Sequence, residues 1–253
     1  MHTSENISVF LIVIFGFVAA KSVQDLPSFL KICHRNDPNL NECVKRSVDS
    51  LKPYLKVGIP TLQIPSCEPL RVPHIEVSQA AGPISIKSTY SDIEIQGGTN
   101  VILKSINVDV NNDRVGLKLF FPRLEMTAHY NMNGKILLLP ITGNGLARGN
   151  WTDIDVIATI QSERYQSQKT GEIHYRVTDI YVDLDVGYAS IHLDNLFNGD
   201  KILSDAMNLF LNNNWDTVAA EMKPALEQTI SELFKTFSNK IYSKYSIDTL
   251  LPP

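Results

Sequence analysis

Residues 201–245 read KILSDAMNLFLNNNWDTVAAEMKPALEQTISELFKTFSNKIYSKY, and their apolar positions recur every three or four residues. This spacing is typical of an amphipathic helix with one apolar stripe. Asp216 is the expected N-cap, and Pro224 is expected to kink the helix or to lie near a junction. Roughly forty helical residues extend about 60 Å, longer than a compact globule of this size is wide. The sequence therefore predicts an elongated body. The stripe comprises Val218, Met222, Leu226, Ile230, Leu233, Phe237 and Ile241.

Residues from about 71 to 195 follow a period of two instead. The stretch LEMTAHYNM, residues 124–132, alternates apolar with polar side chains, as in a strand with one buried face. Asn133-Gly134 is predicted to form a tight hairpin turn, and residues 111–113, Asn-Asn-Asp, another. Several strands joined in this way predict an antiparallel meander with one apolar face.

The parity of the apolar positions changes along these strands. Val115 to Phe121 are apolar at odd positions, but apolar positions are even after Pro122; the same change separates Val177 from Ile180. One extra residue in a strand has this effect, and such bulges curl a sheet. The alternative is two short strands joined by a break. With bulges, the simplest arrangement is an α+β fold in which a highly curved antiparallel sheet wraps along the long C-terminal helix.

The N-terminus predicts export. Residues 7–20, ISVFLIVIFGFVAA, have the length of a signal-peptide core, and Val18 and Ala20 are the small residues before a cleavage site. We assign residues 1–20 to a signal peptide and residues 21–253 to a single secreted domain. The n-region departs from the usual pattern because it contains Glu5 and no Lys or Arg, so an uncleaved anchor is the alternative. No second long apolar run follows, so no stable membrane insertion is expected.

Charge and cysteine content limit the partners further. Removing Glu5 leaves 26 acidic and 23 basic residues, a net charge of −3, which argues against nucleic acid and against attraction to anionic membranes. In an oxidising compartment Cys33 and Cys43 are expected to pair and to close a small loop. Cys67 is then a buried free thiol or, alternatively, a site of intermolecular pairing.

A second helix and a proline-rich stretch follow the cysteine pair. Val44, Val48, Leu51 and Leu55 have helical spacing. Five prolines lie between residues 53 and 73, so this segment is expected to be extended and packed.

The sequence contains few candidate catalytic, metal-binding or modification sites. The chain has no G-x-S-x-G, H-E-x-x-H or C-x-x-C motif, so no catalytic residue, metal site or cofactor is predicted. Asp183 and Asp185 share a strand face, where they either present paired carboxylates to a metal or a sugar or lie as ordinary acids on the outside of a sheet. His129 is expected to be solvated, and residues 143–149, GNGLARG, to form a hairpin loop rather than a phosphate cradle. Asn150 begins an Asn-Trp-Thr glycosylation sequon.

Several segments together resemble the takeout and juvenile-hormone-binding protein family of insects. They are the cysteine pair, GIPTLQIPSCEPLRVPHIEV, FFPRLEM, GKILLLPITGNG and HLDNLFNGDKILSDAMNLFLNNNW followed by MKPAL, and the likeness extends in order over nearly all of residues 25–253. The resemblance implies a tubular lipid-binding fold in which the curved sheet and the helix enclose an apolar tunnel. It also implies pairing of the first two cysteines. The family name does not fix the ligand.

These observations predict a secreted, monomeric, non-enzymatic carrier of a small hydrophobic ligand: a juvenile-hormone-like terpenoid, a fatty acid or another lipid. Methionines suit an adaptable pocket, and Tyr130 or Tyr175 is expected to hold a polar head group. The alternatives are an enzyme acting on a lipophilic ester and a signalling protein with a structural lipid. The same apolar residues also suit a solid core. The candidate tunnel-lining residues are Leu117, Leu119, Leu124, Met126, Ala128, Tyr130, Met132, Tyr175, Phe210, Trp215, Met222, Leu226 and Phe234.

Overall fold

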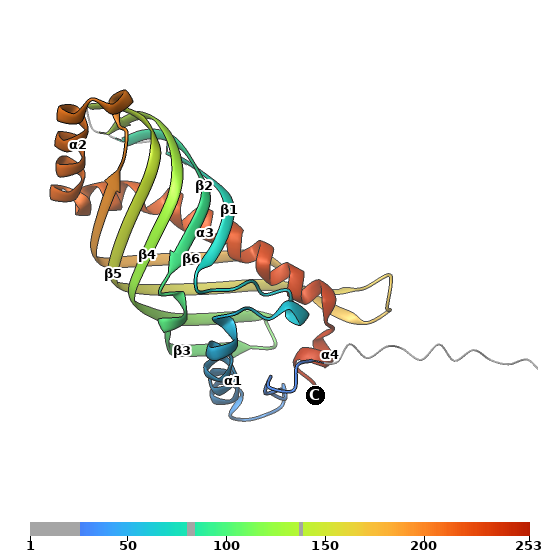
Figure 1. Cartoon of the computed structure of the whole chain (residues 1–253). Coiled ribbons are helices and arrows are strands. Elements are labelled where there is room, and N and C mark those ends of the chain that lie inside the picture. The colour runs from blue at the N-terminus through green and yellow to red at the C-terminus, as the bar shows by residue number, and fades with distance from the viewer. Residues whose placement is uncertain (1–25, 80–83, 137–138) are drawn as a thin grey trace, which may run out of the picture.

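The computed structural model describes residues 26–79, 84–136 and 139–253, so the predicted signal peptide lies outside the described residues. Helices occupy both ends of the described chain, among them the long helix α3 near the C-terminus, and six strands lie between them (Figure 1). The elements in chain order are α1 (Leu40–Leu55), η1 (Pro60–Leu62), β1 (Leu70–Gln79), β2 (Ile84–Gln96), η2 (Gly98–Asn100), β3 (Ile102–Asp109), β4 (Arg114–Ile136), β5 (Leu139–Gln166), β6 (Ile173–Leu193), η3 (Phe197–Gly199), α2 (Lys201–Asn213), α3 (Trp215–Lys244) and α4 (Ile247–Leu250).

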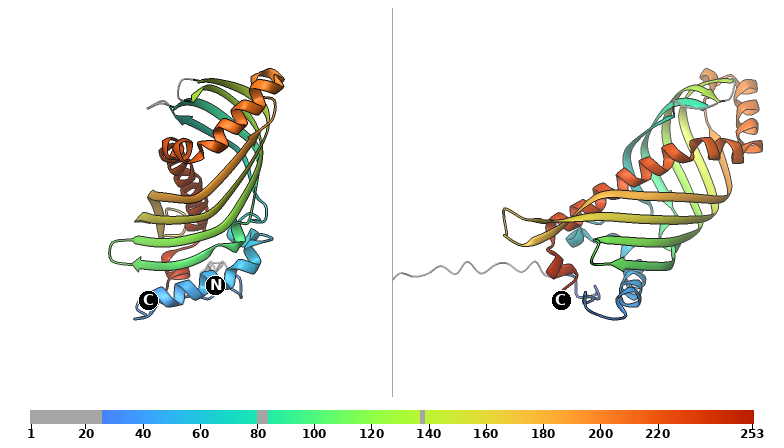
Figure 2. Two further views of the ribbon diagram at one scale, coloured as in Figure 1. Left: turned by 90° about the vertical axis from the view of Figure 1, so that its left-hand side faces the viewer. Right: turned by 180° about the vertical axis from the view of Figure 1, so that it is seen from behind.

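The strands form one antiparallel sheet in the order β1-β2-β4-β5-β6. β3 departs from a simple meander because it pairs with residues 114–120 of β4, whereas β2 pairs with residues 125–136 of the same strand. The sheet is strongly curved and does not close (Figures 1 and 2). α3 runs along its concave side, packs against the edge strand β6 and also contacts β1 and β2 (Figure 2). The predicted α+β arrangement of a curved sheet around a long helix is confirmed.

The C-terminal helical segment is divided in two. Asn214 leaves the helical conformation at φ −120° and ψ 28°, so α2 and α3 run in different directions (Figure 1). α3 alone has 30 residues and is therefore about 45 Å long. The expected N-cap at Asp216 is wrong: Asn214 holds that position, and Asp216 lies in the first turn, where a negative charge favours the positive end of the helix dipole. Pro224 lies inside α3, not at the junction.

The parity changes in the sheet have two different causes. At Val177 the β5–β6 register shifts by one residue, so the predicted bulge is confirmed there. At Pro122 the register does not shift, because Phe121 pairs with Ile154 and Arg123 with Thr152. β4 is also unbroken, so neither a bulge nor a break explains this point. Both strands instead change parity together, where Asp153 adopts φ +54° opposite Pro122.

The predicted turn at Asn133-Gly134 is wrong, whereas the turn at residues 111–113 is confirmed between β3 and β4. β4 continues through Gly134 to Ile136, which pairs with Leu139 of β5. Gly134 is needed because β2 passes close by: a Cβ there would lie 2.1 Å from the carbonyl oxygen of Ser85. The glycine allows close approach of two strands and does not reverse the chain.

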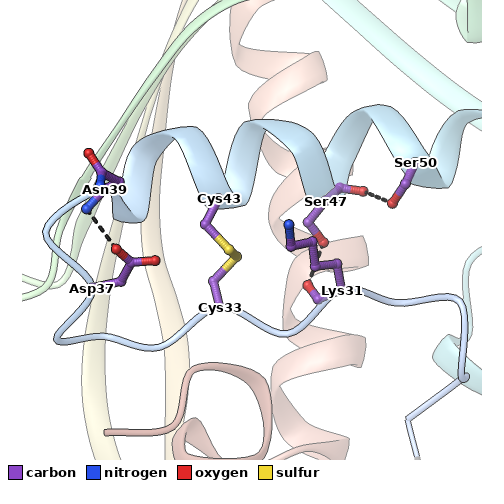
Figure 3. Close-up of a disulfide and its surroundings, with 7 residues drawn as sticks. All are labelled: Lys31, Cys33, Asp37, Asn39, Cys43, Ser47 and Ser50. Carbon is purple, nitrogen blue, oxygen red and sulfur yellow. Dashed lines mark hydrogen bonds between the residues drawn. A yellow bond between two sulfur atoms is a disulfide. The ribbon is translucent and has the colours of Figure 1, made fainter.

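α1 closes the end of the molecule that is opposite α2 (Figure 1). The Cys33–Cys43 disulfide joins it to the preceding segment, and both sulfur-bearing residues are buried (Figure 3). The hydroxyl of Ser47 on the same helix donates to the carbonyl of Lys31 at 2.7 Å. The predicted helix and disulfide are confirmed. Cys67 is a free thiol and is half-buried, and burial, followed by the nearby charge of Glu68, raises its pKa.

Candidate ligand-binding site

Three apolar clusters lie between the concave face of the sheet and the C-terminal helices. The α2 cluster has the buried residues Ile84, Ile86, Tyr130, Met132, Ile136, Ile141, Ala147, Leu193, Leu196, Met207 and Leu211. The β6 cluster has Ile154, Val156, Val177, Ile180 and Val182. The β1 cluster has Val72, Ile93 and Ala128.

The apolar stripe of α3 touches all three clusters in turn. Met222 packs on the α2 cluster, Ile230 on the β6 cluster and Leu233 on the β1 cluster. Leu226 lies between them on the same helix face, but it remains 38% exposed. At Leu226 the apolar face of α3 is therefore accessible and does not pack against any of the three clusters.

Most predicted tunnel-lining residues lie in or against these clusters. Ala128, Tyr130 and Met132 are buried members of the β1 or α2 cluster. The partly buried residues that pack against the clusters are Leu119, Leu124, Met126, Phe210 and Met222. The structure thus brings together residues from β4, α2 and α3, as expected for the two sides of one apolar interior.

The remaining candidates lie elsewhere. Trp215 stacks edge-on against Tyr188 of β6, with ring centroids 5.8 Å apart, outside the three clusters. Leu117 is half-buried and also belongs to none of them. Phe234 is 46% exposed and meets the ring of Phe237 edge-on.

The two tyrosines expected to hold a head group, Tyr130 and Tyr175, already contact other residues of the protein. The hydroxyl of Tyr130 donates to the carbonyl oxygen of Asp194 at 2.7 Å. Burial, with smaller contributions from Tyr90 and Asp194, raises the pKa of Tyr130 to about 12, so it is neutral at physiological pH. Tyr175 packs edge-on against Tyr242, and burial followed by the charge of Asp113 raises its pKa.

The segment GNGLARG is part of β5 and not the predicted hairpin loop. Its glycines allow the chain after β6 to cross closely. A Cβ on Gly143 would lie 3.0 Å from the Cα of Leu196, and one on Gly145 would lie 2.6 Å from the carbonyl oxygen of Asp194. The glycine spacing therefore serves the crossing that also positions Asp194 for Tyr130.

The other polar candidates are on the surface. Asp183 forms an ion pair with Lys223 of α3 at 2.5 Å, whereas Asp185 is exposed, so their arrangement is that of outer acids. His129 is exposed. Asn150 lies within β5 and not in a loop, and its side-chain oxygen accepts a hydrogen bond from Arg123 at 2.7 Å. Its glycosylation stays a prediction.

Side chains of the C-terminal helices cover the free backbone groups of the edge strand β6. Asn208 and Asn212 of α2 each bind both the N–H and the carbonyl of one β6 residue, Leu193 and Ile191 respectively. Asn239 of α3 does the same for Val177. A carboxylate oxygen of Glu227 accepts the N–H of Leu184 at 2.9 Å. We call Asn208, Asn212, Glu227 and Asn239 the edge-binding side chains.

None of the four edge-binding side chains was predicted from the sequence. Asn is unfavourable inside a helix, so several of them in two helices are a signal that each has a partner. An exposed strand edge also needs cover, and here the side-chain amides provide it.

A cleft of about 620 Å³ opens at the seam between α3 and β1. Its walls come from the proline-rich segment, from β1 and from the C-terminal half of α3. The lining residues are Pro60, Gln63, Ile64, Pro65, Arg71, Val72, Pro73, His74, Leu233, Thr236, Phe237 and Lys240. A smaller cavity of about 310 Å³ lies beside the disulfide, between α1 and the end of α3.

Among residues 26–79, 84–136 and 139–253, no helix combines the length and the apolar character that crossing a membrane requires. Within the same ranges, no group of three or more His, Cys, Asp or Glu side chains is arranged to hold a metal ion.

Comparison with known proteins agrees with this architecture. Residues 10–252 match the family model described as haemolymph juvenile hormone binding protein. The circadian clock-controlled protein daywake of Drosophila melanogaster is 26% identical over 232 residues, which cover 89% of this chain and 88% of that protein. A putative beta-carotene-binding protein of Schistocerca gregaria is 21% identical over 219 residues, 86% of each chain. The crystal structure of Takeout 1 of Epiphyas postvittana superposes with a TM-score of 0.71 at 24% identity, covering 88% of this chain and 100% of that one.

Proposed function

Because the chain belongs to the haemolymph juvenile hormone binding protein family, whose members are binding proteins, we propose that it is a secreted carrier of a small hydrophobic ligand. The ligand is a juvenile-hormone-like terpenoid, a fatty acid or another lipid. It lies in the apolar interior between α3 and the concave face of the sheet. The chain acts as a monomer and transports or buffers this molecule in extracellular fluid.

The observation that carries the proposal is the accessible surface of Leu226. Its neighbours on the stripe, Met222 and Ile230, are packed, yet Leu226 is 38% exposed on the same face. A ligand with about 400 Å² of apolar surface gains roughly 10 kcal/mol on burial, before the costs of immobilisation and polar desolvation. Such binding needs apolar area and no catalytic group.

Two further features support export and carriage. The Cys33–Cys43 bridge suits an oxidising compartment. The family is named for haemolymph and for the binding of juvenile hormone. An enzyme that acts on a lipophilic ester is the alternative, and incubation with a radiolabelled lipid ester separates the two, because a carrier returns the ester unchanged.

The test of the interior compares two tryptophan substitutions. Leu226→Trp adds a ring where the helix face is accessible, so binding should fall while stability stays nearly constant. Met132→Trp overfills a buried position and should cost about 1–3 kcal/mol of unfolding free energy. Displacement of a fluorescent fatty-acid probe measures binding, and thermal denaturation of ligand-stripped protein measures stability. If Leu226→Trp binds the probe like the wild type, the proposed location is wrong.

A further inference from the structure

We propose that the cleft between α3 and β1 binds the carboxylate head of an anionic amphiphile, such as a long-chain fatty acid, whose tail enters the apolar interior. This inference rests on the proposed carrier function and narrows its ligand to one chemical class. Two observations carry it: the cleft adjoins the interior, and its charged lining is of one sign.

The cleft and the interior share residues. Val72 and Leu233 line the cleft and also belong to, or pack on, the β1 cluster. Phe237 extends this apolar lining one turn further along α3. The cleft therefore borders the β1 cluster, and a tail that displaces these side chains would reach the concave face of the sheet. The volume of about 620 Å³ lies within the ordinary range for small-molecule sites, about 300–1,000 Å³.

The wall opposite α3 is held in place before any ligand arrives. Ile59 and Ile64 exchange two backbone hydrogen bonds, of 2.8 and 3.1 Å, across the turn that contains Pro60. The hydroxyl of Tyr245 donates to the carbonyl of Thr61 at 2.7 Å, and Lys244 binds the same oxygen. A wall fixed in this way costs a ligand little ordering entropy.

The charged lining of the cleft is basic, although the chain as a whole carries a net charge of −4. Arg71, His74 and Lys240 line it, and no Asp or Glu is among the lining residues. The Arg71 guanidinium donates to Glu94 at 2.8 Å, so part of its charge is already used. Within the described part of the chain, no carboxylate pairs with Lys240 or His74, and the ammonium of Lys240 lies 5.7 Å from the ring centroid of Phe237.

Lys240 is thus a cation placed directly beside the apolar lining, and the ring N–H of His74 is a further hydrogen-bond donor in the lining. An apolar trough with a basic rim matches a molecule that has an apolar tail and an anionic head. A neutral terpenoid ester offers this rim hydrogen-bond acceptors but no negative charge.

The experiment compares two competitors of equal chain length, hexadecanoic acid and hexadecan-1-ol, that displace Nile red at pH 8, where an alkyl carboxyl group is ionised. In the wild type the acid should bind about fivefold more tightly than the alcohol, the effect of one partly exposed ion pair. Lys240→Met should lower the affinity for the acid more than the affinity for the alcohol, and so remove most of this preference. Lys235→Met, on the same helix but outside the cleft lining, should keep the preference.

A third variant tests the cleft without changing charge. Thr236→Trp places a ring at the cleft and should weaken both competitors. Equal affinities of the wild type for acid and alcohol, or equal behaviour of Lys240→Met and Lys235→Met, would overturn the inference. If the wild type binds neither Nile red nor either competitor, the carrier function itself fails, so the two failures are distinguishable.

Discussion

Asn239 fastens α3 to the edge of β6, and replacement by leucine removes both hydrogen bonds that it makes there. Its side-chain oxygen accepts the N–H of Val177 at 2.8 Å, and its side-chain nitrogen donates to the carbonyl of the same residue at 3.1 Å. Val177 is 1% exposed. Leucine has nearly the same size and a better helix propensity, so the chief loss is that two buried backbone groups lose their partners.

The magnitude follows from those two groups. A buried polar group without a partner costs about 1–3 kcal/mol, and because Asn239 is only half-buried, water can reach part of the site. We therefore expect Asn239→Leu to lower the unfolding free energy by about 2–3 kcal/mol. For a chain of this length the melting temperature should fall by about 4–12 °C. Asn213→Leu, at an exposed position of α2, is the matched control and should change stability by less than about 0.5 kcal/mol.

Urea denaturation gives the change in unfolding free energy, and amide hydrogen exchange gives its location. The Val177 amide should exchange faster in Asn239→Leu than in the wild type, while the Leu193 amide, which Asn208 holds, should keep its protection. Equal stability of Asn239→Leu and Asn213→Leu, or an unchanged Val177 exchange rate, would show that the hydrogen bonds between Asn239 and Val177 do not stabilise the fold.

Two further predictions concern the N-terminal half. Replacing both Cys33 and Cys43 by serine should cost roughly 2–3 kcal/mol in urea denaturation, and reductant should then have no further effect on stability; a variant as stable as the oxidised wild type would contradict this. Burial pushes the pKa of Glu68 up, but hydrogen bonds from Gly97 and Thr99 hold it below its usual value. The carboxylate therefore stabilises the fold above its unfolded pKa of about 4.3, and this contribution is lost as the pH falls through the lower folded value. Glu68→Gln should be less stable than the wild type at pH 7, with a gap that narrows toward pH 3; a gap that does not narrow would contradict the assignment.

Local periodicity was enough to predict the parts of the fold that local physics decides. The alternation from Leu124 to Met132 gives the inward face of β4 correctly, because one side of that strand is buried. The stripe from Val218 to Leu233 likewise gives the face of α3 that meets the three clusters. In both segments the apolar pattern follows burial, because one face of the strand or helix is buried and the opposite face is exposed.

The errors fall where a distant segment decides the conformation. Asn133-Gly134 has the composition of a turn, but the approach of Ser85 on β2 is what requires the glycine. Gly143 and Gly145 are similarly required because the chain near Asp194 and Leu196, about fifty residues later, passes close to them. A glycine at such a position indicates that another segment of the chain lies close to it, but the glycine alone does not identify that segment.

The edge-binding side chains also account for how an accessible interior is compatible with a stable fold. A helix held to a sheet only by its apolar stripe would have to pack that stripe tightly, because burial would be its sole source of docking energy. Here Glu227 and Asn239 hold α3 to backbone groups of β6, and Lys223 adds an ion pair to Asp183. Docking therefore does not depend on sealing the whole stripe, and Leu226 can remain accessible without loss of the helix position. The polar contacts with the edge of β6 hold α3 in position, and the apolar face of α3 is available for the ligand.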